Sequence, residues 1–353
     1  MFMGREVRDI MYYRRRRRRI FILILTLTVL CAAAVILLLT HGFSTYTYTV
    51  LEDGTAEITE YRGRETKVEI PAQFDGHPVS SIGEKAFFWR ISIRQIKFPA
   101  TLRTIGDGAF TGCTGLTEII LPEGITALGE KAFAECVRLR SVTLPESLTA
   151  LGSRAFENCS VLPEIDLPAA VTTLGDNPFC GCRSLTRVNH STLTAENGML
   201  TEAGRLIWYP GIATATEITL PEGIKTLGSC AFHGFDRLEH LNLPSTLAAI
   251  GNYTFSGCVR LRDLRLPDTV QTIGNAAFAE CTSLTHLSIP EGVPALGHLT
   301  FFGCRGLTDL TLPNSITFLD GSAFIDCTGL TVHASPGSFA EEYCRSAGIP
   351  TDT

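Results

Sequence analysis

Residues 121–136 read LPEGITALGEKAFAEC, and close variants of this phrase recur every 23 residues along most of the 353-residue chain. In each copy a phenylalanine lies four residues after a glycine, as Phe133 follows Gly129, although Asp320 replaces the glycine of the last copy. The phenylalanines of the series are Phe87, Phe110, Phe133, Phe156, Phe179, Phe232, Phe255, Phe278, Phe301 and Phe324. This strict register predicts a solenoid of about ten similar rungs rather than a globule around one central core.

The apolar positions indicate how one rung folds. Residues 116–121 alternate as a strand does, which places Ile119 in the core and Glu118 on the outer face. Pro122 ends the strand because proline has no N–H to donate to a neighbour. We expect the strands of successive rungs to pair in parallel about 4.8 Å apart, which gives a strand-rich α/β solenoid with a parallel sheet on one face.

The corner after this strand depends on glycine. Gly129 permits either a close approach to the neighbouring rung or a backbone with positive φ. Ala132 and Phe133 follow, and we expect them to fill the interior from a short helical or 3₁₀ turn. The repeat thus accounts for almost every distinctive residue without any need for catalysis.

The register breaks once, because Gly175 and Gly228 lie 53 residues apart, seven more than two periods. An irregular rung is therefore expected at about residues 190–215, with a small hairpin that turns near Glu202. Trp208 and Tyr209 lie on this hairpin. An irregular rung of a repeat protein often projects from one face and takes part in binding, so both aromatic residues are candidate binding residues. The alternative is that Trp208 packs the joint between two half-solenoids.

Both ends of the solenoid, residues 81–335, need a cap because a terminal rung has no neighbour on one side. Residues 41–80 contain two alternating segments around Asp53-Gly54, which predicts a hairpin cap and a lead-in. Residues 336–353 predict a capping helix, in which Ser338 is the N-cap and Glu341 has the spacing of a capping box.

The N-terminus predicts a membrane anchor. Residues 1–19 carry eight arginines and two acids, whereas residues 20–40 carry no charge and are long enough to span a bilayer as a signal-anchor helix. The basic side is expected in the cytoplasm and residues 41–353 outside the cell. A cleaved signal peptide is the alternative. Since the chain has a net charge of −6 and its first 19 residues carry +6, the remainder carries −12, which argues against a nucleic-acid partner.

The phrase at residues 121–136 and its copies resemble the BspA-type leucine-rich-repeat family. The resemblance extends from the entry hairpin through the irregular rung to the terminal PGSFAEEYCRSAGI, residues 336–349. The resemblance implies a leucine-rich-repeat solenoid and a bacterial cell-surface or secreted protein. Some members of the family are implicated in adhesion. It does not imply a particular ligand.

Eight of the twelve cysteines occupy one repeat slot, three residues after the phenylalanine. Phe235 fills this slot in one copy, so we interpret the slot as apolar and its thiols as buried core residues. Cys180-x-Cys182 with His190 lacks a fourth ligand, so no metal site is expected. Cys180 and Cys230 flank the irregular rung and are candidates for a disulfide, with two unpaired thiols as the alternative.

No nucleophile, metalloprotease, phosphate-loop or dinucleotide motif is present, so we expect no enzyme activity and no cofactor. The outward strand positions are the candidate ligand-binding face, because they vary without disturbing the core. These positions include Glu118, Ser141, Glu164, Asp166, Arg187, His240, Asn242, Asp263, Arg265, His286 and Asp309. The sequence thus predicts a membrane-anchored extracellular protein that recognises or adheres to a protein or glycan. A structural spacer or envelope component without a ligand is the alternative.

Overall fold

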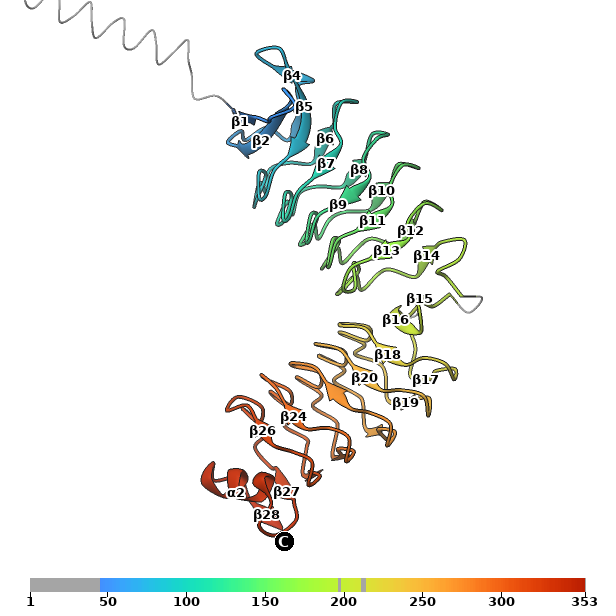
Figure 1. Cartoon of the computed structure of the whole chain (residues 1–353), viewed down its shortest axis with the longest axis vertical. Coiled ribbons are helices and arrows are strands. Elements are labelled where there is room, and N and C mark those ends of the chain that lie inside the picture. The colour runs from blue at the N-terminus through green and yellow to red at the C-terminus, as the bar shows by residue number, and fades with distance from the viewer. Residues whose placement is uncertain (1–44, 196–197, 211–213, 353) are drawn as a thin grey trace, which may run out of the picture. The chain divides into compact units, whose positions relative to one another are not determined.

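The computed structural model describes residues 45–195, 198–210 and 214–352. The predicted membrane segment, residues 20–40, and the basic segment, residues 1–19, lie outside these ranges. The described part of the chain contains no helix with the length and hydrophobicity needed to cross a membrane. Residues 48–353 belong to a single compact unit, which is a strand-rich parallel solenoid (Figure 1).

Each rung contributes a short strand to the predicted sheet, and these strands pair in parallel and in register. Ser141 lies opposite Glu118, and Asp309 lies opposite His286. In the first half of the solenoid the strands are β3 (Lys67–Glu69), β6 (Gln95–Lys97), β8 (Glu118–Ile120), β10 (Ser141–Thr143), β12 (Glu164–Asp166) and β14 (Arg187–Asn189). In the second half they are β17 (Glu217–Thr219), β19 (His240–Asn242), β21 (Asp263–Leu264), β23 (His286–Ser288), β25 (Asp309–Thr311) and β27 (Thr331–His333).

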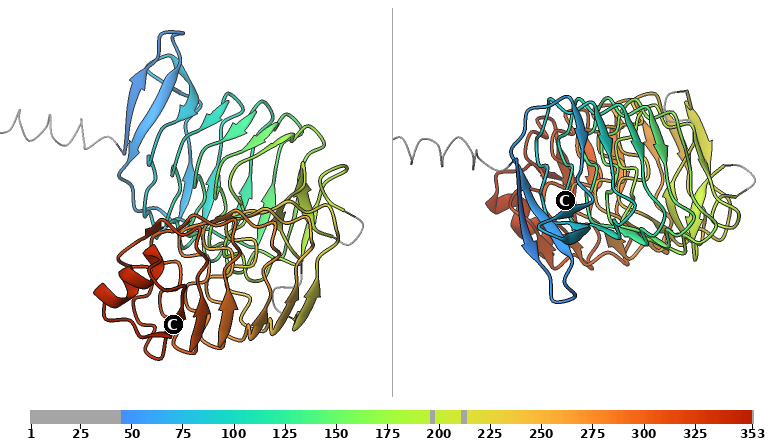
Figure 2. Two further views of the ribbon diagram at one scale, coloured as in Figure 1. Left: turned by 60° about the horizontal axis from the view of Figure 1, so that its bottom comes forward. Right: turned by 90° about the horizontal axis from the view of Figure 1, so that it is seen from above.

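Every rung also contributes to a second parallel ladder, so the prediction of a sheet on one face was incomplete (Figure 2). Its two-residue strands end just before the repeat glycine. The last residue of each strand is an isoleucine or a leucine, and this side chain is buried in the core. They are β7 (Thr104–Ile105), β9 (Ala127–Leu128), β11 (Ala150–Leu151), β13 (Thr173–Leu174), β18 (Thr226–Leu227), β20 (Ala249–Ile250), β22 (Thr272–Ile273), β24 (Ala295–Leu296) and β26 (Phe318–Leu319).

The solenoid has about 13 rungs, more than the ten predicted. The additional rungs lack the glycine–phenylalanine mark on which the prediction was based. Strand β3 already pairs with β6 in the segment predicted as a lead-in, and β27 pairs with β25 after the last marked copy. Main-chain pairing extends further than the side-chain pattern because backbone hydrogen bonds need no particular residue.

Stacked phenylalanines form the centre of the core. Phe110 and Phe133 have ring centroids 5.1 Å apart, and Phe278 and Phe301 have centroids 5.3 Å apart, with nearly parallel planes in both pairs. The repeat cysteine lies beside this stack and donates its S–H to the carbonyl of a phenylalanine 26 residues earlier, as Cys304 Sγ does to Phe278 O at 3.0 Å. The cysteine slot therefore combines a small apolar side chain with a weak donor. The predicted burial holds except at Cys327, which is half-buried.

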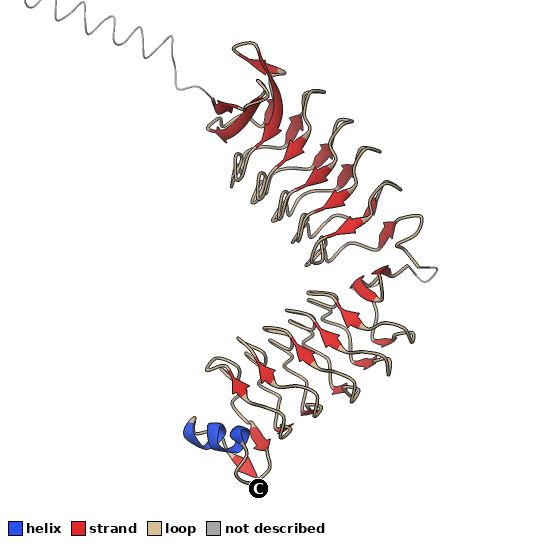
Figure 3. Cartoon of the chain, viewed as in Figure 1, coloured by secondary structure: helices blue, strands red, loops and turns tan. Residues whose placement is uncertain are grey.

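The corner at the repeat glycine requires close approach rather than positive φ. A Cβ on Gly129 would lie 2.5 Å from the carbonyl carbon of Gly106 in the previous rung, a distance that real Cβ atoms do not show. The predicted helical turn after it was wrong, because Lys131 and Glu135 have φ of 52° and 59°. The segment is a series of tight turns, and Figure 3 accordingly shows strands and loops across the rungs.

The irregular rung is a hairpin, as predicted. Strand β15 (Leu200–Glu202) pairs antiparallel with β16 (Arg205–Trp208) across a turn at Ala203-Gly204, and β16 then pairs in parallel with β18. Trp208 is 4% exposed, and the half-buried ring of Tyr209 lies tilted against that of Phe232, with centroids 5.6 Å apart. The interpretation of Trp208 as a binding residue was therefore wrong, because it packs the joint between the halves. The role of Tyr209 in binding stays a prediction.

A disulfide joins Cys180 to Cys230, with Cα atoms 5.4 Å apart. It connects the last regular rung of the first half to the first marked rung of the second. Of the two alternatives, a disulfide or two unpaired thiols, the structure contains the disulfide. Cys344, which also lies off the ladder, is buried and free.

Additional elements lie at the two ends. Strands β1 (Tyr46–Val50), β2 (Ala56–Tyr61), β4 (Gln73–Phe74) and β5 (His77–Ile82) precede the regular rungs, and helix α2 (Phe339–Ser346) and strand β28 (Thr351–Asp352) follow them. Ser338 Oγ accepts from Glu341 N at 3.3 Å, and Glu341 Oε2 accepts from Gly337 N at 2.7 Å. This side-chain capping satisfies amides at the start of α2 that would otherwise lack partners.

Candidate ligand-binding face

The outward side chains of the three-residue strands form one continuous surface, which we call the strand face. The middle residue of each strand points inward, as Ile119 and Val188 do at 1% exposure. Ten of the predicted site residues are exposed on this face, and Asp309 is half-buried. The 23-residue period places the same slot of successive rungs side by side, so neighbouring charges in space come from residues far apart in sequence.

In the first half, several strand-face charges are paired with a residue of the neighbouring rung. Arg187 forms an ion pair with Glu164, which lies opposite it in the register. Asn189 Nδ2 donates to Asp166 Oδ1 at 2.5 Å. Both contacts are exposed, so they add little to stability, but they occupy the groups that a ligand would use.

The second half contains a groove of about 1090 Å³ over strands β19 to β25. Five of the six predicted residues of this half line it: Asn242, Asp263, Arg265, His286 and Asp309. His240 does not line the groove, but its Nδ1 lies 3.5 Å from Asp263 Oδ2. The structure thus gathers most of the predicted second-half residues into one concave site.

Apart from Ser288 and Thr311, which lie at outward strand slots, the groove has four polar residues that the sequence prediction missed: Glu222, Ser245, Asp268 and His333. The first three occupy the slot directly after the repeat proline, and this recurrence was a signal that could have identified them. Glu222 accepts two hydrogen bonds from Ser245, from its backbone N and its Oγ, each at 3.0 Å. His333 lies on β27, beyond the last marked copy, and only the stacking brings it to the groove.

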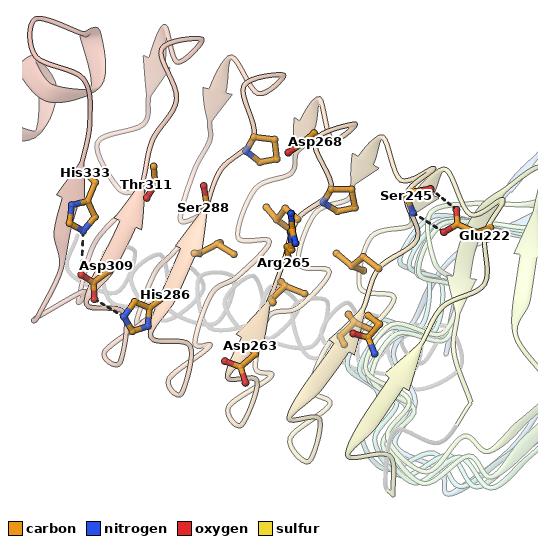
Figure 4. Close-up of a pocket in the computed structure, with 18 residues that line it drawn as sticks. Glu222, Ser245, Asp263, Arg265, Asp268, His286, Ser288, Asp309, Thr311 and His333 are labelled. Carbon is orange, nitrogen blue, oxygen red and sulfur yellow. Dashed lines mark hydrogen bonds and ion pairs between the residues drawn. The ribbon is translucent and has the colours of Figure 1, made fainter.

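Histidine and aspartate alternate along the groove edge at one slot of four successive rungs: His240, Asp263, His286 and Asp309. Asp309 lies between two imidazoles, with Oδ2 3.0 Å from His286 Nε2 and Oδ1 3.2 Å from His333 Nε2 (Figure 4). The Thr308 hydroxyl and then His333 donate to this carboxyl and lower its pKa below the usual range. Asp309 is thereby kept ionised and fixed in position.

Arg265 is the one lysine or arginine among the described residues that line the groove. Among the described residues it has no hydrogen-bond or ion-pair partner, and its side chain is exposed. A guanidinium with free donors matches a carboxylate in geometry and charge. The groove therefore offers one available cation among four carboxylates: Glu222, Asp263, Asp268 and Asp309.

The residues at the groove edge do not assemble a metal centre. Within residues 45–195, 198–210 and 214–352, no three or more His, Cys, Asp and Glu side chains are grouped so as to hold a metal ion.

The model of the BspA-type leucine-rich-repeat region matches residues 80–197 and 210–331, in six copies. The chain belongs to the BspA-type leucine-rich-repeat family. Solenoids of this family are generally binding scaffolds, and no catalytic family is indicated. The break between the two matched segments coincides with the irregular rung.

Three solved structures are similar to this BspA-type chain. A leucine-rich cell surface protein from Faecalibacterium prausnitzii is 27% identical with a TM-score of 0.66, and the alignment covers 89% of this chain and 98% of that one. A leucine-rich-repeat protein from Eubacterium ventriosum is 23% identical (83% and 82% covered, TM-score 0.59). The pneumococcal vaccine antigen PcpA is 19% identical (87% and 96% covered, TM-score 0.62). The last two show the fold alone. No curated protein matched the chain.

Proposed function

We propose that this protein is a membrane-anchored cell-surface protein whose second-half groove recognises an extracellular protein ligand. The observation that carries the proposal is the groove itself, where the strand face concentrates one free arginine and four carboxylates at slots that the core does not use. The family and the cell-surface relative from F. prausnitzii support an extracellular location. The uncharged segment at residues 20–40, preceded by arginines, supports an anchor with the solenoid outside.

The lining of the groove favours a protein over a glycan. No phenylalanine, tyrosine or tryptophan is among the lining residues, so the groove lacks the aromatic platforms on which sugar rings stack. Its carboxylates outnumber its one arginine by four to one. A complementary ligand segment presents basic side chains around a carboxylate that pairs with Arg265.

The groove is ordered before a ligand arrives. Parallel backbone pairs fix strands β19 to β21 and β23 to β25, and Asp309 is held by Thr308, His286 and His333. A site whose side chains are already positioned loses less conformational entropy on binding. The one arginine among the outward strand slots of the first half, Arg187, is already paired with Glu164, which is why we assign recognition to the second half.

Synthetic peptides graded from acidic to basic, probed against the full chain in lipid nanodiscs, test the recognition site. Basic peptides that contain a carboxylate are expected to bind, and Arg265→Glu with Asp268→Lys is expected to weaken binding about tenfold or more, as for central interface residues. Arg187→Glu with Glu164→Lys is the matched control on the first half and should leave binding unchanged. Binding that survives the groove variant, or that the control abolishes equally, contradicts the proposal and favours a spacer.

Protease treatment of intact cells, with a tag at each terminus, tests the location separately. Loss of the C-terminal tag with survival of the N-terminal tag is the expected result. If the C-terminal tag survives until the cells are lysed, the extracellular location is wrong.

A further inference from the structure

The first marked rung carries an exposed apolar cluster, Phe88, Trp89 and Ile91, which we call the aromatic patch. These side chains are 43%, 53% and 60% exposed, although the adjacent Phe87 is fully buried in the core stack. The same three slots of the next rung hold Thr111, Gly112 and Thr114. The repeat therefore does not require apolar residues here, and a contiguous exposed patch of this kind marks an interaction site.

The patch is held in place rather than loosely attached. Trp89 has φ of 54°, in the left-handed region that is unfavourable for a bulky side chain. Its N–H donates to Thr111 O at 2.8 Å, and its ring lies against Gly112, where a Cβ would come within 2.6 Å of the ring. Phe88 packs edge-on to Trp89 at 6.3 Å. The backbone thus presents the indole to the outside at a conformational cost.

Unpaired basic residues lie close to the patch along the chain. Arg62 and Lys85 are paired with Glu60 and Glu84, but Arg64, Lys67 and Arg94 are exposed and have no ion pair among the described residues. Arg94 follows Ile91 by three residues, and its backbone N donates to Thr66 O at 2.7 Å. Tryptophan with apolar neighbours suits the membrane–water interface, and nearby lysines and arginines are attracted to anionic lipid.

The covalent chain limits how far the first rungs can lie from the predicted membrane segment. Tyr48 lies nine residues after Leu39, the end of the apolar run, and nine residues cannot span more than about 32 Å however they are arranged. Strand β2 then contacts the first marked rung directly, since Tyr61 N donates to Ala86 O at 2.8 Å. The tether of an anchored chain therefore leaves this rung able to reach the lipid.

We propose that the aromatic patch docks the first rungs on the outer surface of the bilayer, with Trp89 in the interface and the neighbouring basic residues on anionic headgroups. The proposal rests on the membrane anchor proposed above. Docking orients the solenoid against the membrane instead of leaving it free on its tether. A protein partner or a second copy on the same patch is a distinct outcome of the test.

Tryptophan fluorescence tests the docking, because the chain has two tryptophans and the other, Trp208, is buried. The full chain is reconstituted in vesicles of equal parts phosphatidylglycerol and phosphatidylethanolamine, with or without brominated acyl chains. The expected result is loss of the Trp89 emission in brominated vesicles. Trp89→Phe supplies the residual signal of Trp208, which should not change with bromination.

A matched control moves the exposed tryptophan to the far end of the solenoid. Phe318 on β26 is 53% exposed, the same as Trp89, so Phe318→Trp in the Trp89→Phe background should remain bright in brominated vesicles. Equal quenching at both positions means non-specific contact with lipid and overturns the proposal.

Flotation of the same vesicles separates the two proposals. Protein that does not float lacks the anchor, so both the location and the docking fail. Protein that floats with Trp89 unquenched keeps the anchor and overturns the docking alone. If Trp89 is then also shielded from aqueous acrylamide, a protein covers the patch instead of lipid.

Discussion

The two halves of the solenoid have the same interior and different strand faces. Phe133 in the first half and Phe278 in the second each stack on a phenylalanine on both sides and carry the same cysteine-to-carbonyl hydrogen bond. Outside, the first half pairs Glu164 with Arg187, whereas the second leaves Arg265 without a partner in a groove. The stacking constrains the interior of every rung but leaves the outward slots free to vary, and the halves differ there.

Truncation of the phenylalanine stack should have the largest effect and the same effect in both halves. Phe133→Ala and Phe278→Ala each remove a fully buried ring, so each is expected to lower the free energy of unfolding by about 3–5 kcal/mol. Urea denaturation followed by circular dichroism measures the loss. Ile120→Ala, at a side chain that is 56% exposed, is the control and should change stability by less than about 0.5 kcal/mol. A difference of several kcal/mol between the two phenylalanine variants contradicts the equivalence of the interiors.

The disulfide at the joint should have the next largest effect. Cys180 and Cys230 are separated by 50 residues, and removing a bond that closes such a loop is expected to cost roughly 2–4 kcal/mol. Cys180→Ala with Cys230→Ala should therefore unfold at lower urea concentration than the native chain. Hydrogen exchange resolved by peptide shows which half loses protection.

Reduction provides the control for this experiment. A reducing agent should lower the stability of the native chain and leave the double variant unchanged, because the other cysteines of residues 45–352 that the structure describes are free. Equal sensitivity of both proteins to the reducing agent rules out a stabilising role for the bond.

The smallest expected effect is a dependence of the free energy of unfolding on pH. It arises at the slot directly after the repeat phenylalanine, which the two halves fill with different titratable residues. Burial and then Arg183 lower the pKa of His233, while in the first half burial raises the pKa of Glu157 at the equivalent slot despite Arg154 at 3.6 Å. Below about pH 6.5 the unfolded state therefore binds more protons at His233 than the folded state, so the free energy of unfolding falls as the pH drops. The effect of Glu157 has the opposite sign. Above about pH 4.5 the folded state binds more protons at this carboxyl than the unfolded state, so the free energy of unfolding falls as the pH rises.

Stability measured by urea denaturation from pH 4 to pH 8 checks both signs. His233→Gln should flatten the decline on the acidic side of about pH 6.5, and Glu157→Gln should flatten the decline above about pH 4.5. If His233→Gln leaves the acid limb as steep as before, the burial of this imidazole is not what makes the second half sensitive to acid.

The candidate site shows how much of a binding face can be predicted from the spacing of residues in the sequence. The period predicted that Asp263, Arg265, His286 and Asp309 share an outward slot, because a strand alternates its side chains whatever the fold around it. It did not predict that these residues line one groove together with Glu222 and His333, while Glu118 lines a separate, smaller hollow on the strand face of the first half. Concavity depends on how successive rungs and their loops stack, and a periodic sequence carries no direct signal of that.

The sequence by itself determined the solenoid, the register of its rungs, the hairpin at the break and the N-cap at Ser338, because each follows from local periodicity or turn chemistry. The tertiary structure decided which sequence-distant groups meet. It buried Trp208, joined Cys180 to Cys230, added a second ladder beside the repeat glycines and brought His333 to Asp309. These outcomes depend on contacts between rungs, where distance is set by stacking and not by separation along the chain.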